Sequence, residues 1–379
     1  MIEIDGSRGE GGGQVLRTAL SLSCHLKKPV RIFKIRANRK NPGLMPQHIT
    51  CVRAAQLISG AEVKGDSIGS SELIFIPDKV QCGHYRFDIG TAGSTSLVLQ
   101  TLILPLCFAD SEPRSCAQGR GESHVTISGG THVPWSPPFH YLKDVFLPFL
   151  KKLGIDVHLD IERWGFYPKG GGLIKASIKP VSRRQMPEGQ IKTISPISLE
   201  ERGKLKAVKG LSAVGNLPLS IAERQKASAL EILKSYAFSS KANQPVAENE
   251  NIEILSAPCI GQGTFFFLVS EFENSIAGFS SLGQRGKRAE DVGKDAAEEF
   301  IKFFYSNAPV EKRLADQIVP YLSLSVGIDS IRDRKSSFIT SEITKHLLTN
   351  IEVVKKFLDV KFEVSGKEGE KGKVTISAY

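Results

Sequence analysis

A glycine-rich run near the start of the chain has the residue types of an anion-binding turn. Residues 9–17 read Gly-Glu-Gly-Gly-Gly-Gln-Val-Leu-Arg and lie between a predicted strand ending near Asp5 and a predicted helix. Glycines let backbone N–H groups approach an anion, and the helix N-terminus adds a positive end. If the helical pitch starts near Glu10, then Glu10, Gln14 and Arg17 share a polar face that suits metal and phosphate. A tight turn with a solvated face is the alternative, since the spacing matches no P-loop.

Two further clusters combine basic and amide side chains beside predicted strands and helices. Arg36 and Arg39 follow a strand and precede a helix that carries Gln47, and paired guanidinium groups suit bidentate recognition of phosphate. Gln100 is the one amide on an otherwise apolar helix, where a buried glutamine usually has a hydrogen-bonding task. On pattern alone, a surface charge run and a structural glutamine explain these residues equally well.

Of the eight histidines, His346 has the most suggestive setting. Thr344 is placed to cap a helix whose apolar row runs through Leu347, Ile351 and Val354, so that His346 lies in the first turn beside the buried face. The positive end of a helix attracts phosphate. A structural or surface histidine is the other reading, and the pattern alone does not choose between them.

These residues are positioned by a pattern of helices and strands that occurs three times. Each copy has a helix and a strand, then an amphipathic helix, a short link and two alternating strand-like runs. The leading helices are predicted over residues 12–24, 94–108 and 313–327, and the amphipathic helices over residues 46–60, 138–154 and 344–358. Three α/β units of this kind are expected to form one multi-lobed domain.

The third copy is interrupted by a stretch with its own helix and strand pattern. The interruption begins in the polar run at residues 182–189, which has the composition of a linker. We therefore expect an α/β (α+β) fold. Its large catalytic domain is predicted over residues 1–187 and 306–379, and a smaller inserted α/β domain over residues 188–305.

The composition fits a globular enzyme with phosphate-rich partners. Lys and Arg outnumber Asp and Glu by 50 to 40, which favours nucleic acid, although a basic protein without such a role fits the charge as well. Six scattered cysteines without a Cys-x-x-Cys pair favour a reducing compartment and no zinc site. Because no signal-peptide or membrane-spanning pattern is found, we expect no membrane partner and a cytoplasmic location, or a nuclear one in a eukaryote.

Taken together and in order, these segments closely resemble the RNA 3′-terminal phosphate cyclase family over essentially the whole chain. The stretches that carry the resemblance are residues 10–17, 35–39, 42–44, 47–48, 93–94, 99–100, 165–172, 280–286 and 314–317, and the sequence His-Leu-Leu-Thr-Asn at residues 346–350. The resemblance implies a large domain of three repeated units with a smaller insert. That expectation agrees with the split third copy.

The resemblance also implies a reaction and the residues that perform it. ATP, with Mg²⁺ or Mn²⁺, would convert an RNA 3′-phosphate to a 2′,3′-cyclic phosphate through a covalent histidine-AMP and an RNA-adenylate. The family's nucleophile falls on His346 and its metal-associated carboxylate on Glu10. Its phosphate-binding arginines and further active-site positions fall on Arg17, Arg36, Arg39, Gln47, Gln100, Asp316 and Gln317. Cyclases often have an aromatic residue where this chain has Arg313, whose guanidinium can also stack on adenine.

Two other functions compete with this one. A catalytically silent branch of the family acts in ribosomal RNA maturation and lacks the nucleophilic histidine, so His346 favours the enzyme. A noncatalytic RNA-binding or ribosome-assembly factor of the same fold is the more serious alternative, because basic charge and phosphate sites would persist without turnover. An enolpyruvyl transferase, a fold relative with a small-molecule substrate, offers no role for His346 in this setting.

Overall fold

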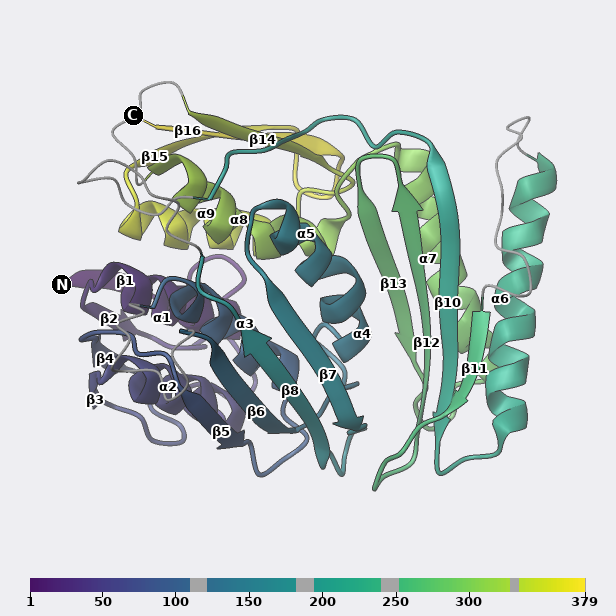
Figure 1. Cartoon of the computed structure of the whole chain (residues 1–379), viewed down its shortest axis with the longest axis horizontal. Coiled ribbons are helices and arrows are strands. Elements are labelled where there is room, and N and C mark those ends of the chain that lie inside the picture. The colour runs from purple at the N-terminus through teal and green to yellow at the C-terminus, as the bar shows by residue number, and fades with distance from the viewer. Residues whose placement is uncertain (110–120, 182–193, 240–251, 328–333, 379) are drawn as a thin grey trace.

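The computed structural model describes residues 1–109, 121–181, 194–239, 252–327 and 334–378 (Figure 1). The predicted linker at residues 182–189 therefore lies outside the described residues. In the described part of the chain the strands form four mixed sheets of four strands each, which confirms the mixed α/β class. Within the same residues, no helix is both long enough and apolar enough to cross a membrane.

The first α/β unit occupies the N-terminal part of the chain. Its elements are β1 (Ile2–Asp5), α1 (Gly13–Leu26), β2 (Val30–Phe33), α2 (Pro46–Ser59), β3 (Glu62–Lys64) and β4 (Leu73–Ile76). The strand order is β1-β2-β4-β3, in which only the β1–β2 pair is parallel, with Ile2 opposite Val30.

The second unit repeats this arrangement. Its elements are β5 (His84–Asp88), α3 (Thr95–Cys107), β6 (Ser123–Gly129), α4 (Phe139–Tyr141), the π-helical turn η1 (Leu142–Phe146), α5 (Leu147–Lys152), β7 (Val157–Arg163) and β8 (Gly172–Ile178). The strand order is β5-β6-β8-β7, again with the first two strands parallel and the other pairs antiparallel.

The third unit has the same strand order but is split after its first strand. Its elements are β9 (Ser198–Leu199), α8 (Lys312–Gly327), β14 (Lys335–Thr340), α9 (Lys345–Phe357), β15 (Val360–Ser365) and β16 (Gly372–Ala378). β9 pairs in parallel with β14, although it lies in the range predicted for the insert. The exact division into domains stays a prediction.

The elements between β9 and α8 form the fourth sheet and its two helices. They are β10 (Leu205–Gly215), α6 (Leu219–Ser239), β11 (Ile252–Ser256), β12 (Gly263–Phe272), β13 (Ile276–Leu282) and α7 (Ala289–Ser306), with strand order β11-β10-β12-β13. Figure 1 shows both helices on the face of this sheet that points away from the repeated units. Side chains alternate along β12, so Phe266 and Leu268 join the core under the helices while Phe265 and Phe267 join the main core.

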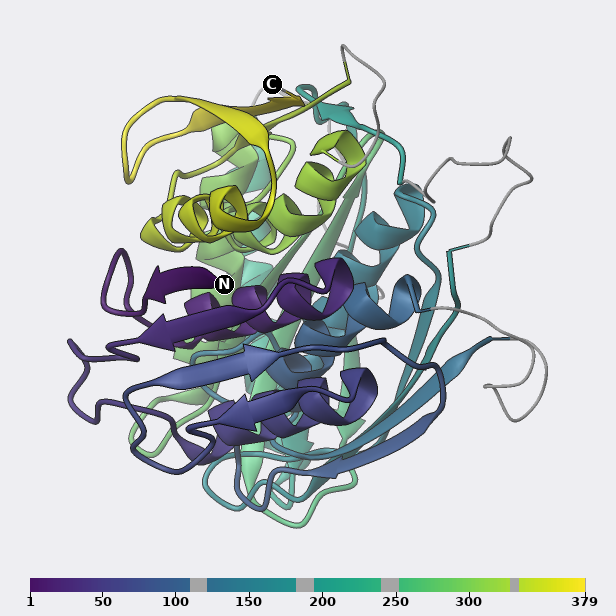
Figure 2. The same ribbon diagram turned by 90° about the vertical axis from the view of Figure 1, so that its left-hand side faces the viewer.

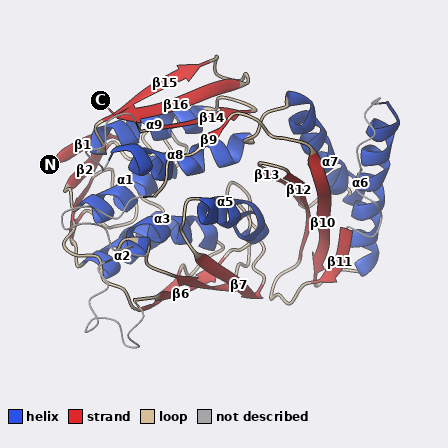
Figure 3. Cartoon of the chain, turned by 45° about the horizontal axis from the view of Figure 1, so that its top comes forward, coloured by secondary structure: helices blue, strands red, loops and turns tan. Residues whose placement is uncertain are grey.

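Helices of the three repeated units pack together at the centre, with the sheets around them (Figure 3). Figure 2 shows the first unit, in purple, directly beneath the yellow-green third unit. The helix α3 is buried at every position except Gln100, as expected for a helix that is apolar all round. Gln100 is therefore the one side chain of α3 that is only partly buried.

Candidate functional site

A cavity of about 880 Å³ lies where α1, α3, α8 and α9 meet. All nine site residues predicted from the sequence line it, and they come from all three repeated units. They are Glu10, Arg17, Arg36, Arg39, Gln47, Gln100, Asp316, Gln317 and His346. Side chains separated by more than 300 positions in the sequence therefore face one space.

His346 stands in the first turn of α9, whose N-terminus is capped by Thr344 through a 3.1 Å hydrogen bond from the Leu347 N–H. Its Nδ1 lies 2.8 Å from Oε1 of Gln14, and Nε2 of Gln14 donates to Oδ2 of Asp316 at 2.7 Å. Because an amide oxygen only accepts, Nδ1 carries the proton and Nε2 keeps its lone pair. Burial, with the charges of Arg17 and Arg39, lowers the pKa of His346 below its usual value, so the imidazole is neutral.

Asp316 is the half-buried end of this chain of contacts. Burial, followed by the charge of Glu311, raises the pKa of Asp316 to about 7, while Gln14 and Arg17 oppose the rise. Nδ2 of Asn350 donates to the Asp316 carbonyl at 2.6 Å, and Thr18 donates to Oδ1 of Asn350 at 2.7 Å. These bonds fasten α8 to α9 and α9 to α1 around the histidine.

Glu10 lies in the turn before α1. The condition that helical pitch starts near Glu10 is not met, because α1 starts at Gly13 and Gly11 adopts a positive φ of 60°. Its N–H donates to Oγ1 of Thr349 at 2.9 Å, and its carboxylate forms an ion pair with Arg39. Oε1 of Glu10 stands 4.0 Å from Nε2 of His346. A Cβ on Gly12 would overlap this carboxylate, so a larger residue there would displace the Glu10 side chain from this position.

The three predicted phosphate-binding arginines differ in their partners. Arg39 also donates to the Glu10 carbonyl at 3.0 Å, and Arg36, at a φ of 53°, donates to the Gly43 carbonyl at 2.9 Å. Within the described residues the guanidinium of Arg17 has no hydrogen bond or ion pair, and burial lowers its pKa from the usual value. A partly buried cation without a partner favours an anion in the cavity.

His48 adds a neutral donor beside these arginines. Burial, then the charges of Arg17 and Arg36, lowers the pKa of His48 to about 3. Its Nδ1 accepts from the Met45 N–H at 3.1 Å, so Nε2 carries the proton. A Cβ on Gly13 would overlap both His48 and Arg17, so the glycine allows both side chains to reach the cavity.

The predicted glutamines bridge the repeated units. Oε1 of Gln47 accepts from the Ser94 N–H at 2.8 Å, which joins the first unit to the second. Nε2 of Gln100 donates to Oε1 of Gln317 at 2.6 Å, and Nε2 of Gln317 donates to the Arg313 carbonyl at 2.6 Å. These contacts hold α3 and α8 at a fixed separation across the cavity.

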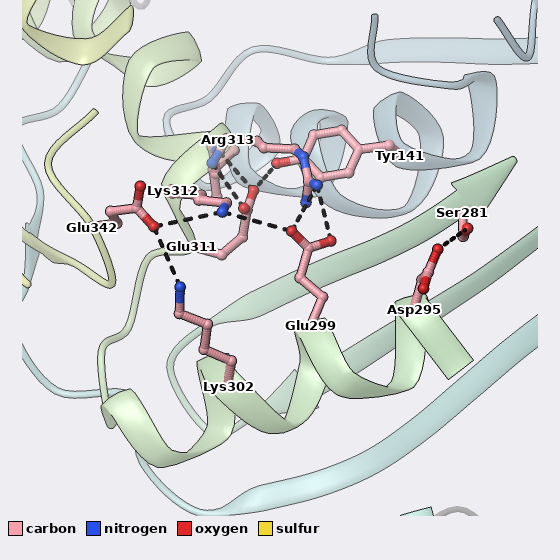
Figure 4. Close-up of polar contacts among 10 residues, drawn as sticks. Tyr141, Ser281, Asp295, Glu299, Lys302, Glu311, Lys312, Arg313 and Glu342 are labelled. Carbon is pink, nitrogen blue, oxygen red and sulfur yellow. Dashed lines mark hydrogen bonds and ion pairs between the residues drawn. The ribbon is translucent and has the colours of Figure 1, made fainter. Parts of the chain in front are cut away.

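Arg313 belongs to a charged network where α7 meets the start of α8 (Figure 4). One nitrogen of its guanidinium lies 2.7 and 2.9 Å from the two carboxylate oxygens of Glu299 on α7. Lys312 and Lys302 both pair with Glu342, at 3.5 and 3.8 Å. The helix α7, which packs on the fourth sheet, therefore contacts residues that line the cavity, namely Lys312, Arg313 and Glu342.

The residues fit a divalent cation only together with a ligand's phosphates. Among the described residues no group of three or more His, Cys, Asp or Glu side chains could hold a metal by itself. Glu10 supplies one carboxylate beside Nε2 of His346. Mg²⁺ commonly binds through one or two carboxylates plus substrate phosphate oxygens, so Glu10 suits that role.

The cavity is also lined by residues that are not among the nine predicted ones, and four of these, Gln14, His48, Asn350 and Trp135, carry side chains of functional interest. The helical spacing of Gln14 relative to Arg17 was a usable signal, and Asn350 lies in the His-Leu-Leu-Thr-Asn stretch. His48 directly follows Gln47. For Trp135, which lies in a loop between prolines, the local pattern gives no signal.

Comparison with known proteins gives one consistent result. A sequence model of a family described as RNA 3′-terminal phosphate cyclase matches residues 8–364. Proteins with this name are similar over nearly their full lengths. The one from Staphylothermus marinus is 42% identical over 99% of this chain and 98% of its own. Those from Sulfurisphaera tokodaii and Pyrococcus furiosus are 44% and 40% identical, over 97% and 99% of this chain and 97% and 98% of their own.

Proposed function

This chain belongs to the RNA 3′-terminal phosphate cyclase family, and we propose that it uses ATP to convert an RNA 3′-phosphate to a 2′,3′-cyclic phosphate. Membership confirms the family and the enzyme class predicted from the sequence. The observation that carries the chemistry is the line of contacts from Asp316 through Gln14 to His346. It leaves the lone pair of a neutral imidazole in a cavity lined with arginines.

In the first step, Nε2 of His346 attacks the α-phosphorus of ATP. A P–N bond forms, the bond from this phosphorus to the bridging oxygen breaks, and pyrophosphate leaves. The hydrogen bond from Nδ1–H to Gln14 stabilises the positive charge that develops on the ring. Direct attack of a 2′-OH on the RNA 3′-phosphate would instead have to expel a very poor oxygen leaving group.

Two further phosphoryl transfers complete the reaction. An oxygen of the RNA 3′-phosphate attacks the phosphorus of the histidine-AMP, so the P–N bond breaks and a phosphoanhydride forms. The adjacent 2′-OH then attacks the 3′-phosphorus, loses its proton, and expels AMP as the ring closes. ATP and the 3′-phosphate end are thereby converted to AMP, pyrophosphate and the cyclic end.

The charged residues of the cavity have distinct parts in this scheme. Arg17, Arg36 and Arg39 bind and orient phosphate oxygens, with Arg17 the best placed because its guanidinium makes no hydrogen bond or ion pair among the described residues. Glu10 would hold Mg²⁺ or Mn²⁺ together with phosphate oxygens, and the ion would offset negative charge on the phosphoryl group. Gln47, Gln100, Asp316 and Gln317 fix the elements that carry these groups.

The test is to follow the AMP. The protein is incubated with ATP labelled at the α-phosphate and a divalent metal, and the labelled peptide is identified. The label is expected on the peptide containing His346, in an acid-labile, alkali-stable bond. His346→Asn keeps a similar size and one hydrogen-bonding edge, so it should fold while labelling and cyclisation are abolished.

A matched control uses a histidine outside the cavity. His158→Asn alters a side chain that is 71% exposed on β7, and its labelling should equal that of the parent protein. Retained labelling in folded His346→Asn would refute the proposed nucleophile. No labelling of the parent protein, with RNA binding intact, would instead support the noncatalytic RNA-binding alternative.

A further inference from the structure

The loop between β6 and α4 is firmly held at both ends. The Phe139 N–H donates to the Thr131 carbonyl at 3.0 Å, which closes the loop, and Oγ1 of Thr131 accepts from the Gly165 N–H at 2.9 Å. His132 is buried and stacks on Trp164 with ring centroids 4.0 Å apart. Both ends of the loop are therefore anchored in the core.

Trp135 stands at the tip of this loop and is fully exposed, at 100% of its surface. Its backbone φ is 65°, in the left-handed region that a bulky residue rarely adopts. Neither packing nor backbone preference therefore accounts for a tryptophan here, and strained, exposed residues of this kind concentrate at ligand sites. Trp135 is one of the residues that line the cavity that holds His346.

The surroundings of Trp135 suit a flat, weakly polar ligand group. Pro134, Pro137 and Pro138 line the cavity beside it, and residues 131–138 contain no charged side chain, because burial holds the pKa of His132 well below 6.5 and keeps its ring neutral. Two other large apolar residues with high exposure, Ile68 and Tyr167, lie outside the cavity lining. Of these three exposed residues, only Trp135 lines the cavity.

We propose that Trp135 is a stacking platform for a nucleobase at the 3′ end of the RNA strand, an inference that rests on the proposed function. An RNA end must enter the cavity from solvent while the rest of the strand stays outside, so an exposed ring lining the cavity is suited to contact it. Stacking on an aromatic side chain tolerates every base, since each base has a π-face. Because both ends of the loop are anchored, less of the loop has to be ordered on binding.

The experiment measures the two half-reactions separately in Trp135→Ala, Trp135→Phe and the parent protein. At saturating ATP, Trp135→Ala is expected to raise the KM for a short 3′-phosphate RNA about 5- to 100-fold, the loss expected for one stacked base. The expected loss is confined to the RNA-dependent step, so labelling by ATP alone continues. Trp135→Phe should restore most of the RNA affinity, and Ile68→Ala, outside the cavity, should behave as the parent protein.

Fluorescence gives a direct readout of contact. The chain has two tryptophans, and Trp164 is buried, so quenching by added RNA in the absence of ATP should disappear in Trp135→Phe. An unchanged KM for RNA in Trp135→Ala, without quenching in the parent protein, would refute the proposal. The proposal would also be refuted if Trp135→Ala lost labelling by ATP alone as strongly as it lost activity on RNA, since the indole would then contact the base of ATP. If the parent protein is never labelled, the proposed function fails, whereas RNA quenching still tests Trp135.

Discussion

At the scale of single residues, the arrangement around His346 selects which ring nitrogen reacts. Asp316 accepts from the amide NH₂ of Gln14, and this fixes the amide oxygen toward Nδ1 of the imidazole. Gln14 does not titrate, so its orientation depends on the protonation of Asp316. The reactivity of Nε2 is thus linked to a carboxyl group that never touches the ring.

This linkage predicts a pH dependence for labelling by ATP. The pKa of Asp316 is raised to about 7. As pH falls through this value, Asp316 becomes protonated and can donate to the oxygen of Gln14. The amide would then turn its NH₂ toward Nδ1, and the proton of the ring would move to Nε2. The labelling rate is therefore expected to fall as pH drops from 8 to 6, before His346 itself, with its lowered pKa, becomes protonated.

Two variants separate the titration of Asp316 from its contact. Asp316→Asn still accepts through its amide oxygen but does not titrate, so it should retain labelling at pH 8 and lose the decline near pH 7. Asp316→Ala removes the contact and should lower the rate at all pH values, on the order of 100-fold for a misplaced reacting group. A parent-like pH profile in Asp316→Asn would assign the titration to another group.

The nine predicted residues all line one cavity, but the sequence did not predict their contacts. His346 and Gln14 are separated by 332 positions, and no local pattern reports a hydrogen bond over that separation. The assumption of a helix starting at Glu10 failed because the glycines there form a turn with a positive φ at Gly11. That turn brings the carboxylate to within 4.0 Å of Nε2 of His346.

At the scale of elements, the start of α8 depends on one buried carboxylate. Glu311 accepts from the backbone N–H groups of Arg313 at 2.8 Å and Leu314 at 2.6 Å, and from the hydroxyl of Tyr141 on α4. It is 1% exposed, and burial raises its pKa. Since α8 carries Asp316 and Gln317, this cap fixes the position of two cavity residues relative to Tyr141 in the second unit.

Glu311→Ala is therefore expected to destabilise the protein strongly. It removes a helix cap, worth about 1 kcal/mol, and leaves the buried hydroxyl of Tyr141 without an acceptor, at about 1–3 kcal/mol. Urea unfolding should show a loss of about 2–4 kcal/mol. Glu352→Ala on α9, whose side chain is 71% exposed, should change stability by less than about 0.5 kcal/mol. Equal effects of the two substitutions would contradict the capping role.

The helices were the easiest elements to predict. Each predicted helix begins and ends within two residues of the observed element or run of elements, because periodicity and caps such as Thr344 and Ser94 are local signals. The strand β9, at two residues, is too short to carry an alternating pattern. The pairing of β9 with β14, across the intervening fourth sheet, is a tertiary feature that composition does not encode.

At the scale of the whole molecule, the same strand order in three sheets explains how one cavity collects residues from all parts of the chain. In each unit the first two strands are parallel, so the helix that joins them lies on one face of the sheet. Packing three such faces together places α1, α3 and α8 at the centre, with α9 beside α1 and α8 (Figure 3). The repeat pattern predicted the units, but their mutual packing became visible only in the structure.

The protein also contains four buried or half-buried histidines that must stay neutral. Burial lowers the pKa of His25 to about 4 and those of His48 and His140 to about 3, and it holds the pKa of His132 well below 6.5. His132 and His140, both in the second unit, share a 2.9 Å hydrogen bond. Both rings also pack on Phe265 of the fourth sheet. In the unfolded chain these groups titrate near 6.5.

The unfolded chain therefore binds more protons than the folded protein between about pH 6.5 and pH 3. Stability contributed by these neutral histidines is fully present above pH 6.5 and is lost as pH falls below it, at up to about 1.4 kcal/mol per pH unit for each group. Asp144 and Asp316, whose pKa values are raised to about 6 and about 7, oppose part of the loss because the folded protein binds their protons more tightly, and so does Glu311, whose pKa burial also raises. Four histidines outweigh three carboxyl groups, so acid is expected to unfold the protein.

Urea unfolding between pH 7.5 and 4.5 measures this slope, and His140→Gln isolates one contribution. Gln can keep a hydrogen bond to His132 but binds no proton, so the variant should be less stable than the parent at pH 7.5 because the ring's packing is lost. Its stability should nevertheless fall less steeply below pH 6.5, by up to about 1.4 kcal/mol per pH unit. The matched change His158→Gln, at a 71% exposed site, should leave the slope unchanged. Parallel stability curves for the parent and His140→Gln would mean that the buried ring is protonated without unfolding, and that acid sensitivity has another source.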